Sequence, residues 1–497
     1  MAENYSEKNS YPTSNLFHTF LFLYAAKTLD LSGKTTFSFP EENLLAEGAV
    51  YLLVDLVLYN TKVYTQKGLI EAGIAINKDR IVKIAKKTNL PKATTQIDLK
   101  GNLALPGLID SHVHLRDQQL SYKEDFTSGT SAAAAGGITT VVDMPNNQPT
   151  TMSAQTLKER MQLARPNILV NVAFNSAFPA RLHDIPRIVN TGAVGFKLYL
   201  LEQIGGVDIM DDGALLETFK ATRQTRVPIA VHAEDHRMIE QAQRELMKHG
   251  RNDLEAFIEA HSSEAEEKAV KRATEFSRLS GAHLHVCHVS SEKAMETILR
   301  AKKLGHRVTC EVTPHHLLLT TEHLKKYSML ALCVPPLRKR SDVAFLWKNL
   351  QKGLVDTIAS DHAPHTWNEK NDHSAWDAKP GIVGLETMLP LLLTQVQKKR
   401  LMLRQLVSLA CERPAETHHI KDRGNLSEGS FADITVVDLK KETTIDASKF
   451  YSKAKFSPFH GWKVRGLPIK TFVSGQLIMD GGEIVAKQGC GRILKGV

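Results

Sequence analysis

Short apolar runs alternate with longer amphipathic stretches between Leu103 and His362, and this alternation constrains the fold more than any other feature of the chain. Eight runs have the length and composition of buried strands: Leu103–Ile109, Thr139–Met144, Ile168–Phe174, Ala193–Leu200, Pro228–His232, Leu284–His288, Arg307–Val312 and Val355–Ala359. The intervening stretches predict helices, among them Glu124–Ala135, Ser153–Leu163, Ala214–Arg223, Glu264–Leu279, Glu292–Leu304 and Asp342–Leu350. Eight such units favour a closed (β/α)8 barrel of the TIM type over an open α/β sheet.

Strand-like patterns also flank this region on both sides. Residues 49–102 contain β-branched runs broken by Asn, Gly and Lys-Asp, and residues 427–497 return to the same kind of pattern. We therefore predict a barrel over 103–426 and a small β-sandwich domain that the two flanking segments form together. Two independent end domains fit the same pattern. Residues 1–48 carry no motif tied to chemistry, and we expect an appendage that need not be ordered.

The composition excludes several classes of protein. The formal net charge is +9, but Lys and Arg are spread along the chain, which argues against a nucleic-acid surface and fits an anionic small substrate. The apolar stretch Leu16–Ala26 is too short to span a bilayer and lacks a basic flank, so we expect no membrane insertion. Five cysteines without a Cys-x-x-Cys pair argue against a disulfide framework and favour a reducing cytoplasm.

The first chemical signal is the pair His112 and His114 at the end of an apolar strand. Residues two apart in a strand point to the same side, so both imidazoles can reach the mouth of the barrel, where active sites of this fold lie. An isolated His-x-His pair is also common in ordinary strand ends. Further candidates at later strand ends, His232, His288 and Asp361, make a metal site the better interpretation. Imidazole and carboxylate ligands suit zinc in a hydrolytic centre.

Lys197 lies in the fourth predicted strand with apolar neighbours on both sides. An ammonium is costly to bury there, so the side chain either reaches out of the strand end or is chemically modified. Carboxylation by carbon dioxide would convert the amine into an anionic carbamate that can bridge two metal ions.

The motifs together resemble the dihydroorotases of the amidohydrolase superfamily. The resemblance runs from about residue 53 to the C-terminus and is carried by motifs in the family's order: His112-Val113-His114-Leu115-Arg116, Met144-Pro145-Asn146, Gly195-Phe196-Lys197, His232-Ala233-Glu234, His288-Val289-Ser290-Ser291, Asp361-His362-Ala363-Pro364-His365 and Gly381-Ile382-Val383-Gly384-Leu385-Glu386. Each motif alone is weak, and their co-occurrence makes the match specific.

This resemblance implies a zinc-dependent enzyme with two Zn²⁺ ions per subunit. His112, His114 and Asp361 would hold one ion, His232 and His288 the other, and N6-carboxylated Lys197 and a hydroxide would bridge them. Asp361 would also be catalytic, moving a proton from the attacking water to the leaving nitrogen. Residues in substrate contact would be Arg116, Asn146, His365, Pro380 and Gly381, with Arg116 clamping a carboxylate. His315 and His316, in Thr313-Pro314-His315-His316, also belong to the family pattern, and we assign them a structural or supporting role. His362 stands beside the expected ligand Asp361 without needing to be a ligand itself.

The implied reaction is the reversible cyclisation of N-carbamoyl-L-aspartate to dihydroorotate and water in pyrimidine biosynthesis. Two departures put the substrate fit in doubt: Asp117-Gln118-Gln119 stands where dihydroorotases commonly have Glu-Pro-Gly, and Val334 stands where many have a substrate-binding asparagine. A hydantoinase or an allantoinase would share the metal site, and a silent homologue acting as a scaffold is a further alternative. A homo-oligomer, or association with other enzymes of the pathway, is compatible with the sequence.

Overall fold

The computed structural model describes residues 27–29, 35–37 and 53–496 of the chain. The chain divides into two units, Met1–Leu52 and Leu53–Val497. The predicted appendage, residues 1–48, lies outside the described residues apart from the short strands β1 (Lys27–Leu29) and β2 (Thr35–Phe37), which pair antiparallel.

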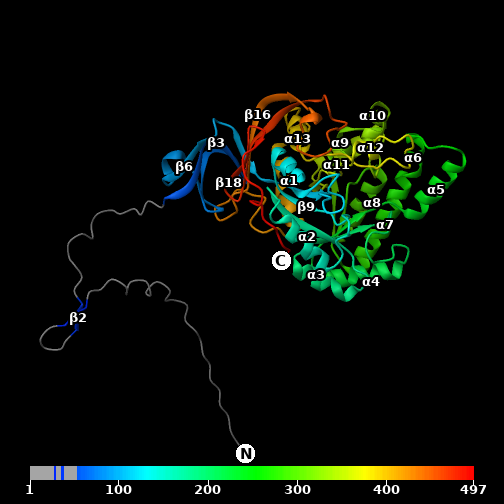
Figure 1. The fold of residues 1–497 in the computed structure, drawn as a ribbon, viewed down its shortest axis with the longest axis horizontal. Coiled ribbons are helices and arrows are strands. Elements are labelled where there is room, and N and C mark those ends of the chain that lie inside the picture. Colours follow the sequence, from blue (N-terminus) through cyan, green and yellow to red (C-terminus); the bar gives the residue numbers. More distant parts are fainter. Residues whose placement is uncertain (1–26, 30–34, 38–52, 497) are drawn as a thin grey trace, which may run out of the picture. The chain divides into compact units, whose positions relative to one another are not determined.

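A closed sheet of eight parallel strands forms the centre of the unit Leu53–Val497 and confirms the predicted fold class (Figure 1). Its strands pair in chain order: β8 (Leu108–Val113), β9 (Ile138–Asp143), β10 (Asn171–Ala177), β11 (Gly195–Tyr199), β12 (Ile229–His232), β13 (Leu284–Val286), β14 (Val308–Val312) and β15 (Thr357–Ile358). A parallel bridge between Val113 and His362 joins the last strand region to the first. The carboxyl ends of all eight strands therefore meet at one rim.

Helices surround the sheet, and the larger ones lie on its outer side (Figure 1). Their bounds are α1 (Phe126–Ala135), α2 (Ala154–Ala164), α3 (Ile185–Thr191), α4 (Asp212–Arg223), α5 (His236–Lys248), α6 (Leu254–Ala260), α7 (Ser263–Ser280), α8 (Glu292–Lys303), α9 (Pro314–Leu318), α10 (Thr321–Tyr327), α11 (Arg340–Gln351), α12 (Trp367–Lys370), α13 (Met388–Gln397), α14 (Leu403–Val407) and α15 (Arg413–Thr417). Side-chain caps fix many starts: Ser153 accepts from the Thr156 N–H before α2, and Ser262 accepts from the Ala265 N–H before α7. The predicted helices are all present within a few residues.

A second sheet of nine strands unites the segments before and after the barrel. Its strands are β3 (Val54–Thr65), β4 (Gly68–Asn77), β5 (Arg80–Ala85), β6 (Ala93–Asp98), β7 (Leu103–Pro106), β16 (Ile434–Thr444), β17 (Lys463–Val473), β18 (Gln476–Asp480) and β19 (Glu483–Ile484). The join is antiparallel pairing of β7 with β16, including Ile434 opposite Pro106. The two terminal segments thus form one small domain, as the sequence predicts.

The prediction of one strand over Leu103–Ile109 was wrong, because the structure divides this segment between two sheets. Its first half is β7 of the small sheet, and its second half begins β8 of the barrel. Gly107 stands at the change, where a Cβ atom would lie 2.2 Å from the side-chain oxygen of Thr139. The chain passes so close to β9 that only glycine fits, and the uniformly apolar sequence hides this change of partner.

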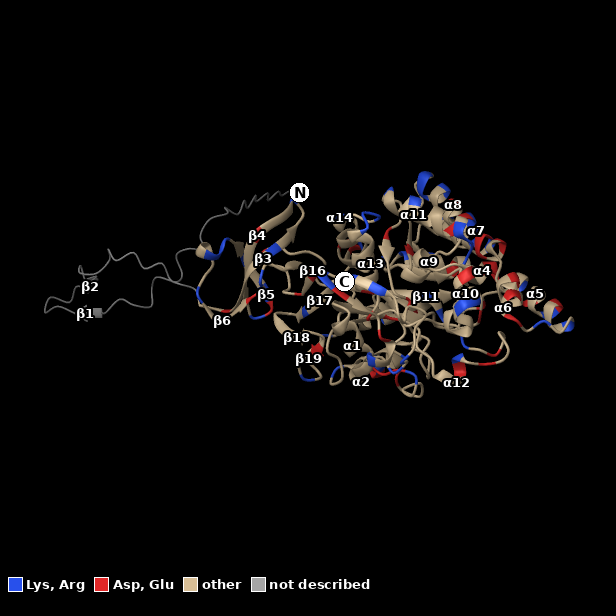
Figure 2. Cartoon of the chain, turned by 90° about the horizontal axis from the view of Figure 1, so that it is seen from above, with Lys and Arg blue, Asp and Glu red and all other residues tan. Residues whose placement is uncertain are grey.

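Charged side chains of both signs are interspersed over the outer helices, as Figure 2 shows for α4, α5, α7 and α8. Many form pairs one helical turn apart, such as Arg244 with Glu240 and Lys248 with Glu245. In the part of the chain that the structure describes, no helix is long and apolar enough to cross a bilayer. All five cysteines are free thiols.

Asp433 connects the small sheet to the barrel through buried polar contacts. Its carboxylate accepts from Asn171 Nδ2 of β10 at 3.0 Å and from the Ser474 N–H at 2.7 Å, and it pairs with Arg423. Both members of the pair are buried, with 3% and 5% of their surface exposed. Removing one charge from a buried pair leaves the other without compensation.

We expect Asp433→Asn to lower the free energy of unfolding by about 3 kcal/mol, because Arg423 would stay buried as an unpaired cation. The measurement is urea denaturation followed by fluorescence. Asp422→Asn is the matched control, since Asp422 pairs with Arg80 at 2.9 Å with exposed fractions of 55% and 37%. An exposed pair contributes at most about 1 kcal/mol, so equal losses in both variants would contradict the assignment.

Candidate metal centre

One cavity of about 630 Å³ opens at the carboxyl ends of the barrel strands. Every residue predicted from the sequence to bind metal or substrate lines it: His112, His114, Arg116, Asn146, Lys197, His232, His288, Asp361, His365, Pro380 and Gly381. The residues come from different strand ends, since His112 lies in β8, Lys197 in β11 and His232 at the last position of β12. Residues up to 269 positions apart therefore line one cavity, as the barrel topology requires.

His112, His114 and Asp361 form the tightest group of candidate metal ligands. Asp361 Oδ1 lies 3.2 Å from His114 Nε2 and 3.4 Å from His112 Nε2. One donor atom from each residue lies within 4.8 Å of the others, and all three side chains are buried. Nitrogen and carboxylate oxygen donors at this spacing suit a divalent cation.

The hydrogen bonds behind these rings fix which nitrogen faces Asp361. His112 Nδ1 donates to Glu311, and His114 Nδ1 donates to Asn146 Oδ1 at 2.7 Å. Burial lowers the pKa of His114 to about 4, so its ring is neutral at pH 7 and its Nε2 carries a lone pair. A lone pair that faces an ionised carboxylate oxygen is repelled unless a cation lies between them. The residues present therefore fit a bound metal ion.

His232 and His288 form the second group. Their rings meet with His232 Nδ1 3.1 Å from His288 Nε2, while His232 Nε2 donates to Glu234 at 2.8 Å. Glu234 also accepts from His261 Nδ1 at 2.9 Å, which anchors the carboxylate from its other side. Burial and the neighbouring His232 hold the pKa of His288 well below its ordinary value. His288 Nδ1 is buried and has no hydrogen-bond partner among the described residues.

Lys197 lies between the two groups and is completely buried. Its Nζ is 3.4 Å from His112 Nε2 and 3.1 Å from Cys287 Sγ, and it lies 5.0 Å from the ring centre of Tyr199. In the described part of the chain no carboxylate forms an ion pair with it. A cation buried in this way among neutral donors is unfavourable, and a carbamate in its place would supply a negative charge.

Three residues of the cavity other than glycine have a left-handed backbone. Arg116, His288 and Asp361 have φ values of 54°, 34° and 46°, which side chains other than glycine rarely adopt. Such conformations persist where the surrounding structure fixes them, and they cluster at functional sites. Here each one lies within three residues after the end of a barrel strand, and its side chain lines the cavity.

A cationic wall faces the candidate metal ligands. Arg116 is 8% exposed, donates to the Pro364 carbonyl at 3.4 Å and lies 3.3 Å from His365 Nε2. His365 Nδ1 is 3.3 Å from Lys123 Nζ, which pairs with Glu369 at 2.7 Å. Burial and these two cations hold the pKa of His365 far below its ordinary value, so its ring is neutral. Among the described residues, no carboxylate pairs with Arg116.

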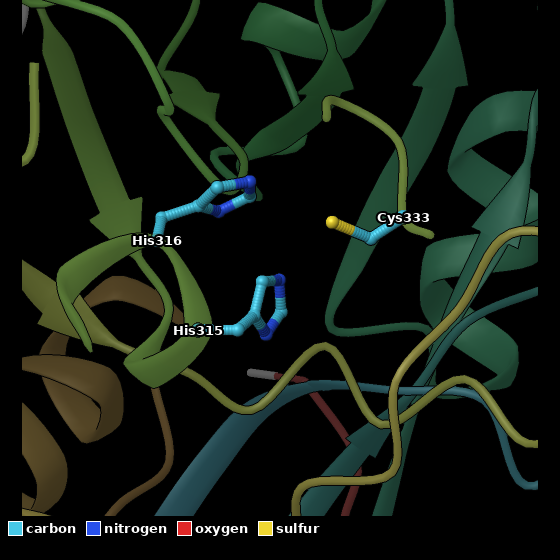
Figure 3. A group of neighbouring side chains, drawn as sticks. All are labelled: His315, His316 and Cys333. Carbon is cyan, nitrogen blue, oxygen red and sulfur yellow. The ribbon is translucent and has the colours of Figure 1, made fainter. Parts of the chain in front are cut away.

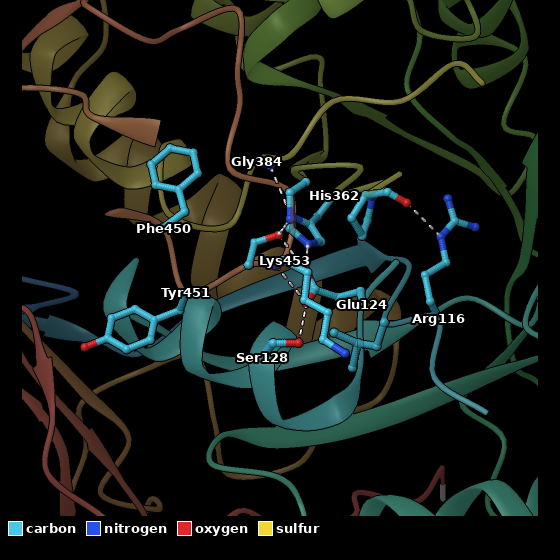
Figure 4. Close-up of polar contacts among 12 residues, drawn as sticks. Arg116, Glu124, Ser128, His362, Gly384, Phe450, Tyr451 and Lys453 are labelled. Carbon is cyan, nitrogen blue, oxygen red and sulfur yellow. Dashed lines mark hydrogen bonds and ion pairs between the residues drawn. The ribbon is translucent and has the colours of Figure 1, made fainter. Parts of the chain in front are cut away.

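His362 follows Asp361 but points away from the cavity. Its Nε2 donates to Glu124 at 3.3 Å and its Nδ1 accepts from the Gly384 N–H at 3.2 Å, so both ring nitrogens are occupied (Figure 4). Glu124 also accepts from Ser128 and from the Lys453 N–H. This network ties the Asp361 loop to the start of α1, a supporting role like the one the sequence predicts.

Several residues of the candidate centre were not predicted from the sequence. Glu311 and Cys287 sit beside His112 inside strands or at their ends, and with it they place three donor atoms within 4.8 Å of one another. Lys123 lies in a loop before α1 and reaches the cavity only through the fold. For Glu234 a signal exists, because it stands two residues after His232, where side chains of an extended segment share a side.

The sequence pattern of the amidohydrolase family matches residues 103–478. The chain belongs to the amidohydrolase family. This family is one of hydrolases, and the match spans the whole barrel, so the chain is an enzyme of the cyclic amidohydrolase group. The candidate ligand groups described above are what a metal-dependent member of this group needs.

Relatives within the amidohydrolase family carry two kinds of name. The chain is 34% identical to the L-hydantoinase of Paenarthrobacter aurescens over 89% of this chain and 98% of that protein. It is 36% identical to a dihydroorotase of Methanosphaera stadtmanae over 86% of this chain and 97% of that protein. Its structure matches the L-hydantoinase (dihydropyrimidinase) from Arthrobacter aurescens with a TM-score of 0.85 at 33% identity, covering 89% of this chain and all of the other.

We predict that Glu311→Gln weakens metal binding by roughly 10- to 100-fold, the usual effect of losing a carboxylate behind a ligating histidine. Glu311 accepts from His112 Nδ1, from the His288 N–H at 3.1 Å and from His285 Nε2 at 3.2 Å, and an amide cannot accept at both of its ends. The measurement is metal retained after dialysis against graded chelator. Glu322→Gln, at a side chain that is 67% exposed, is the control, and equal retention in both variants would refute the role.

Proposed function

We propose that this amidohydrolase is a dihydroorotase, which interconverts dihydroorotate and N-carbamoyl-L-aspartate in pyrimidine biosynthesis. The observation that carries the proposal is the buried Arg116 guanidinium in the cavity wall, without a carboxylate of its own in the described chain. Both proposed substrates carry a carboxylate. A guanidinium binds that group through two parallel hydrogen bonds, and the pair is strong where water is excluded.

The surroundings of Arg116 support an anionic substrate. Lys123 stands behind His365 on the same wall, and Lys379 also lines the cavity. Asn146 donates nothing to His114, since its Oδ1 accepts from that ring, so its amide hydrogens remain available to a ligand. Pro380 and Gly381 also line the cavity, where Lys370 Nζ donates to the Gly381 carbonyl at 2.7 Å and holds this segment in place.

The metal assignment is part of the proposal. His112, His114 and Asp361 would hold one zinc ion, His232 and His288 a second, and carboxylated Lys197 would join them. When bound, the ions supply positive charge that polarises the ring carbonyl and lowers the pKa of water at the site. The buried, unpaired state of Lys197 and the neutral rings of His114 and His288 support this assignment.

In ring opening, Asp361 takes a proton from the attacking water as oxygen adds to the ring carbonyl carbon. The carbon–nitrogen bond then breaks, and Asp361 returns the proton to the leaving ring nitrogen, which yields the open N-carbamoyl amino acid. Arg116 holds the substrate carboxylate throughout. Ring closure follows the same steps in reverse and releases water.

A hydantoinase is the second candidate, and specific observations favour it. Val334 lines the cavity where many dihydroorotases have an asparagine, and it offers no hydrogen bond. Ile239, Phe257 and Trp376 add further apolar surface, which would suit a hydrophobic substituent on the ring. The likeness to the Arthrobacter aurescens L-hydantoinase points the same way. An allantoinase or a silent scaffold homologue has no observation of its own in its favour.

The deciding experiment compares hydrolysis of dihydroorotate, dihydrouracil, a 5-substituted hydantoin and allantoin by the purified enzyme, with and without chelator. We expect the highest kcat/KM for dihydroorotate, and loss of turnover after metal removal. Preference for the hydantoin would replace the proposed function with the second candidate.

Arg116→Met should lower kcat/KM for dihydroorotate roughly 100-fold, about 3 kcal/mol, while kcat/KM for an uncharged ring should fall far less. Arg340→Met, at an exposed side chain, is the control.

Carboxylation of Lys197 predicts a dependence on carbon dioxide. Apoenzyme reconstituted with zinc in buffer stripped of carbon dioxide should recover slowly, and bicarbonate should restore the rate. Native mass spectrometry should show one added carbon dioxide on the loaded enzyme. Lys197→Ala should show neither effect. In this variant, short carboxylic acids should substitute for the missing carbamate. Full recovery without bicarbonate and an unmodified mass would reject the carbamate.

The proposed enzyme would act in the cytoplasm, where five free thiols stay reduced. Because its substrates would be small molecules, the enzyme would need neither a nucleic acid nor a membrane as a partner. Self-association, or association with other enzymes of the pathway, can be measured directly by light scattering of the purified chain.

A further inference from the structure

A further group of metal-type side chains, His315, His316 and Cys333, shares no member with the residues assigned to the proposed centre. His315 and His316 lie in the first turn of α9, which begins at Pro314 shortly after β14, and Cys333 lies on the loop that leads to Val334. One donor atom of each lies within 4.8 Å of the others, and all three side chains are at most 2% exposed. Figure 3 shows the thiol of Cys333 directed toward the two rings.

His315 leaves a hydrogen-bonding atom unused in this group. Its Nε2 is buried and has no partner in the part of the chain that the structure describes. Buried polar atoms are nearly always satisfied, so an orphaned imidazole nitrogen needs a ligand, a water or an ion beside it. Burial, followed by the neighbouring His316, holds the pKa of His315 well below its ordinary value, so the ring is neutral and can donate a lone pair.

The other two side chains are held in place by one carbonyl. Pro335 O accepts from His316 Nε2 at 3.0 Å and from the Cys333 thiol at 3.3 Å, while His316 Nδ1 lies 2.9 Å from the Thr313 hydroxyl. These contacts fix the rings and the thiol near one point before any ion arrives. A bound cation would replace one hydrogen-bond partner of the His316 ring. On Cys333 it would replace the hydrogen of the thiol.

We propose that His315, His316 and Cys333 bind a cation of borderline or soft character, such as zinc, at a site distinct from the one at His112, His114 and Asp361. Two imidazoles and a thiolate are a ligand set that such ions prefer, and they leave one coordination position free. Metal–nitrogen and metal–sulfur bonds of about 2.0–2.3 Å require the donors to move slightly inward. On binding, the Cys333 thiol loses its proton to solvent and becomes a thiolate.

The site would fasten one wall of the substrate cavity. Cys333 precedes Val334, which lines the cavity, and Leu332 and Gly381 are held by Lys370, whose Nζ donates to both carbonyls. A cation between Cys333 and α9 therefore ties the loop that carries Val334 to the barrel end. Its role is structural and differs from the hydrolytic role proposed for the main centre.

The test uses the full chain loaded with Co²⁺ in place of its native metals. Cobalt bound by a thiolate gives an intense near-ultraviolet charge-transfer absorption, whereas nitrogen and oxygen ligands give none. We expect this band in the wild-type protein, its loss in Cys333→Ser and its loss or shift in His315→Gln. Metal analysis of the zinc-loaded protein should show one equivalent fewer in Cys333→Ser than in the wild type.

Cys287→Ser is the matched control, because Cys287 is the buried thiol next to His112 and belongs to the other group. It should keep the band. Loss of the band in Cys287→Ser with its retention in Cys333→Ser would overturn the proposal, and so would a cobalt-loaded wild-type protein without any band. Because Cys287 also lies in a donor group, the band of the wild-type protein is assigned to Cys333 only if Cys333→Ser loses it and Cys287→Ser keeps it. His315→Gln takes the place of Cys333→Ser if that variant fails to fold, and the test requires no measurement of substrate turnover.

Discussion

Closure of the barrel between its first and last strands is the contact on which the candidate centre depends. The His114 N–H donates to the His362 carbonyl at 2.9 Å, and the Ser360 N–H donates to Asp110 at 3.0 Å. These bonds hold the end of β8 against the residues after β15, and so bring His112 and His114 to Asp361. Without this closure Asp361 and the two histidines, far apart in the chain, would not lie close together in space.

Buried carboxylates then orient the ring nitrogens of the centre. Glu311 accepts a hydrogen bond from Nδ1 of His112, and Glu234 accepts one from Nε2 of His232. The other nitrogen of each ring is therefore free to bind an ion. Glu234 and Glu311 are themselves fully buried, a cost that is met by the several donors around each carboxylate. The same arrangement that makes these rings good ligands also makes the empty centre unfavourable, because lone pairs then face one another.

Much of this could be predicted from the sequence because the pattern repeats. His112, His232, His288 and Asp361 each follow a run of apolar strand residues, and the parallel barrel brings such ends together. Glu311 could not be predicted, since a single acidic residue inside a strand resembles any other until its neighbours are known. The division of Leu103–Ile109 between two strands could not be predicted for a related reason. The residues on both sides of Gly107 are hydrophobic, although the chain leaves one sheet for another there. Helix α5 was not among the predicted helices, and only Ile239 and Leu246 of it are buried.

The pairing of β7 with β16 has a consequence for how the protein is made. The small sheet needs strands from both ends of the chain, and the C-terminal residues also bond to β10, where the Leu494 N–H donates to the Val172 carbonyl at 2.8 Å. During translation, β3 to β7 can pair with one another, but β7 leaves the ribosome long before its second partner, β16, exists. The unpaired edge of β7 must wait while the entire barrel is synthesised, so the nascent chain exposes a strand edge that neighbouring chains can join.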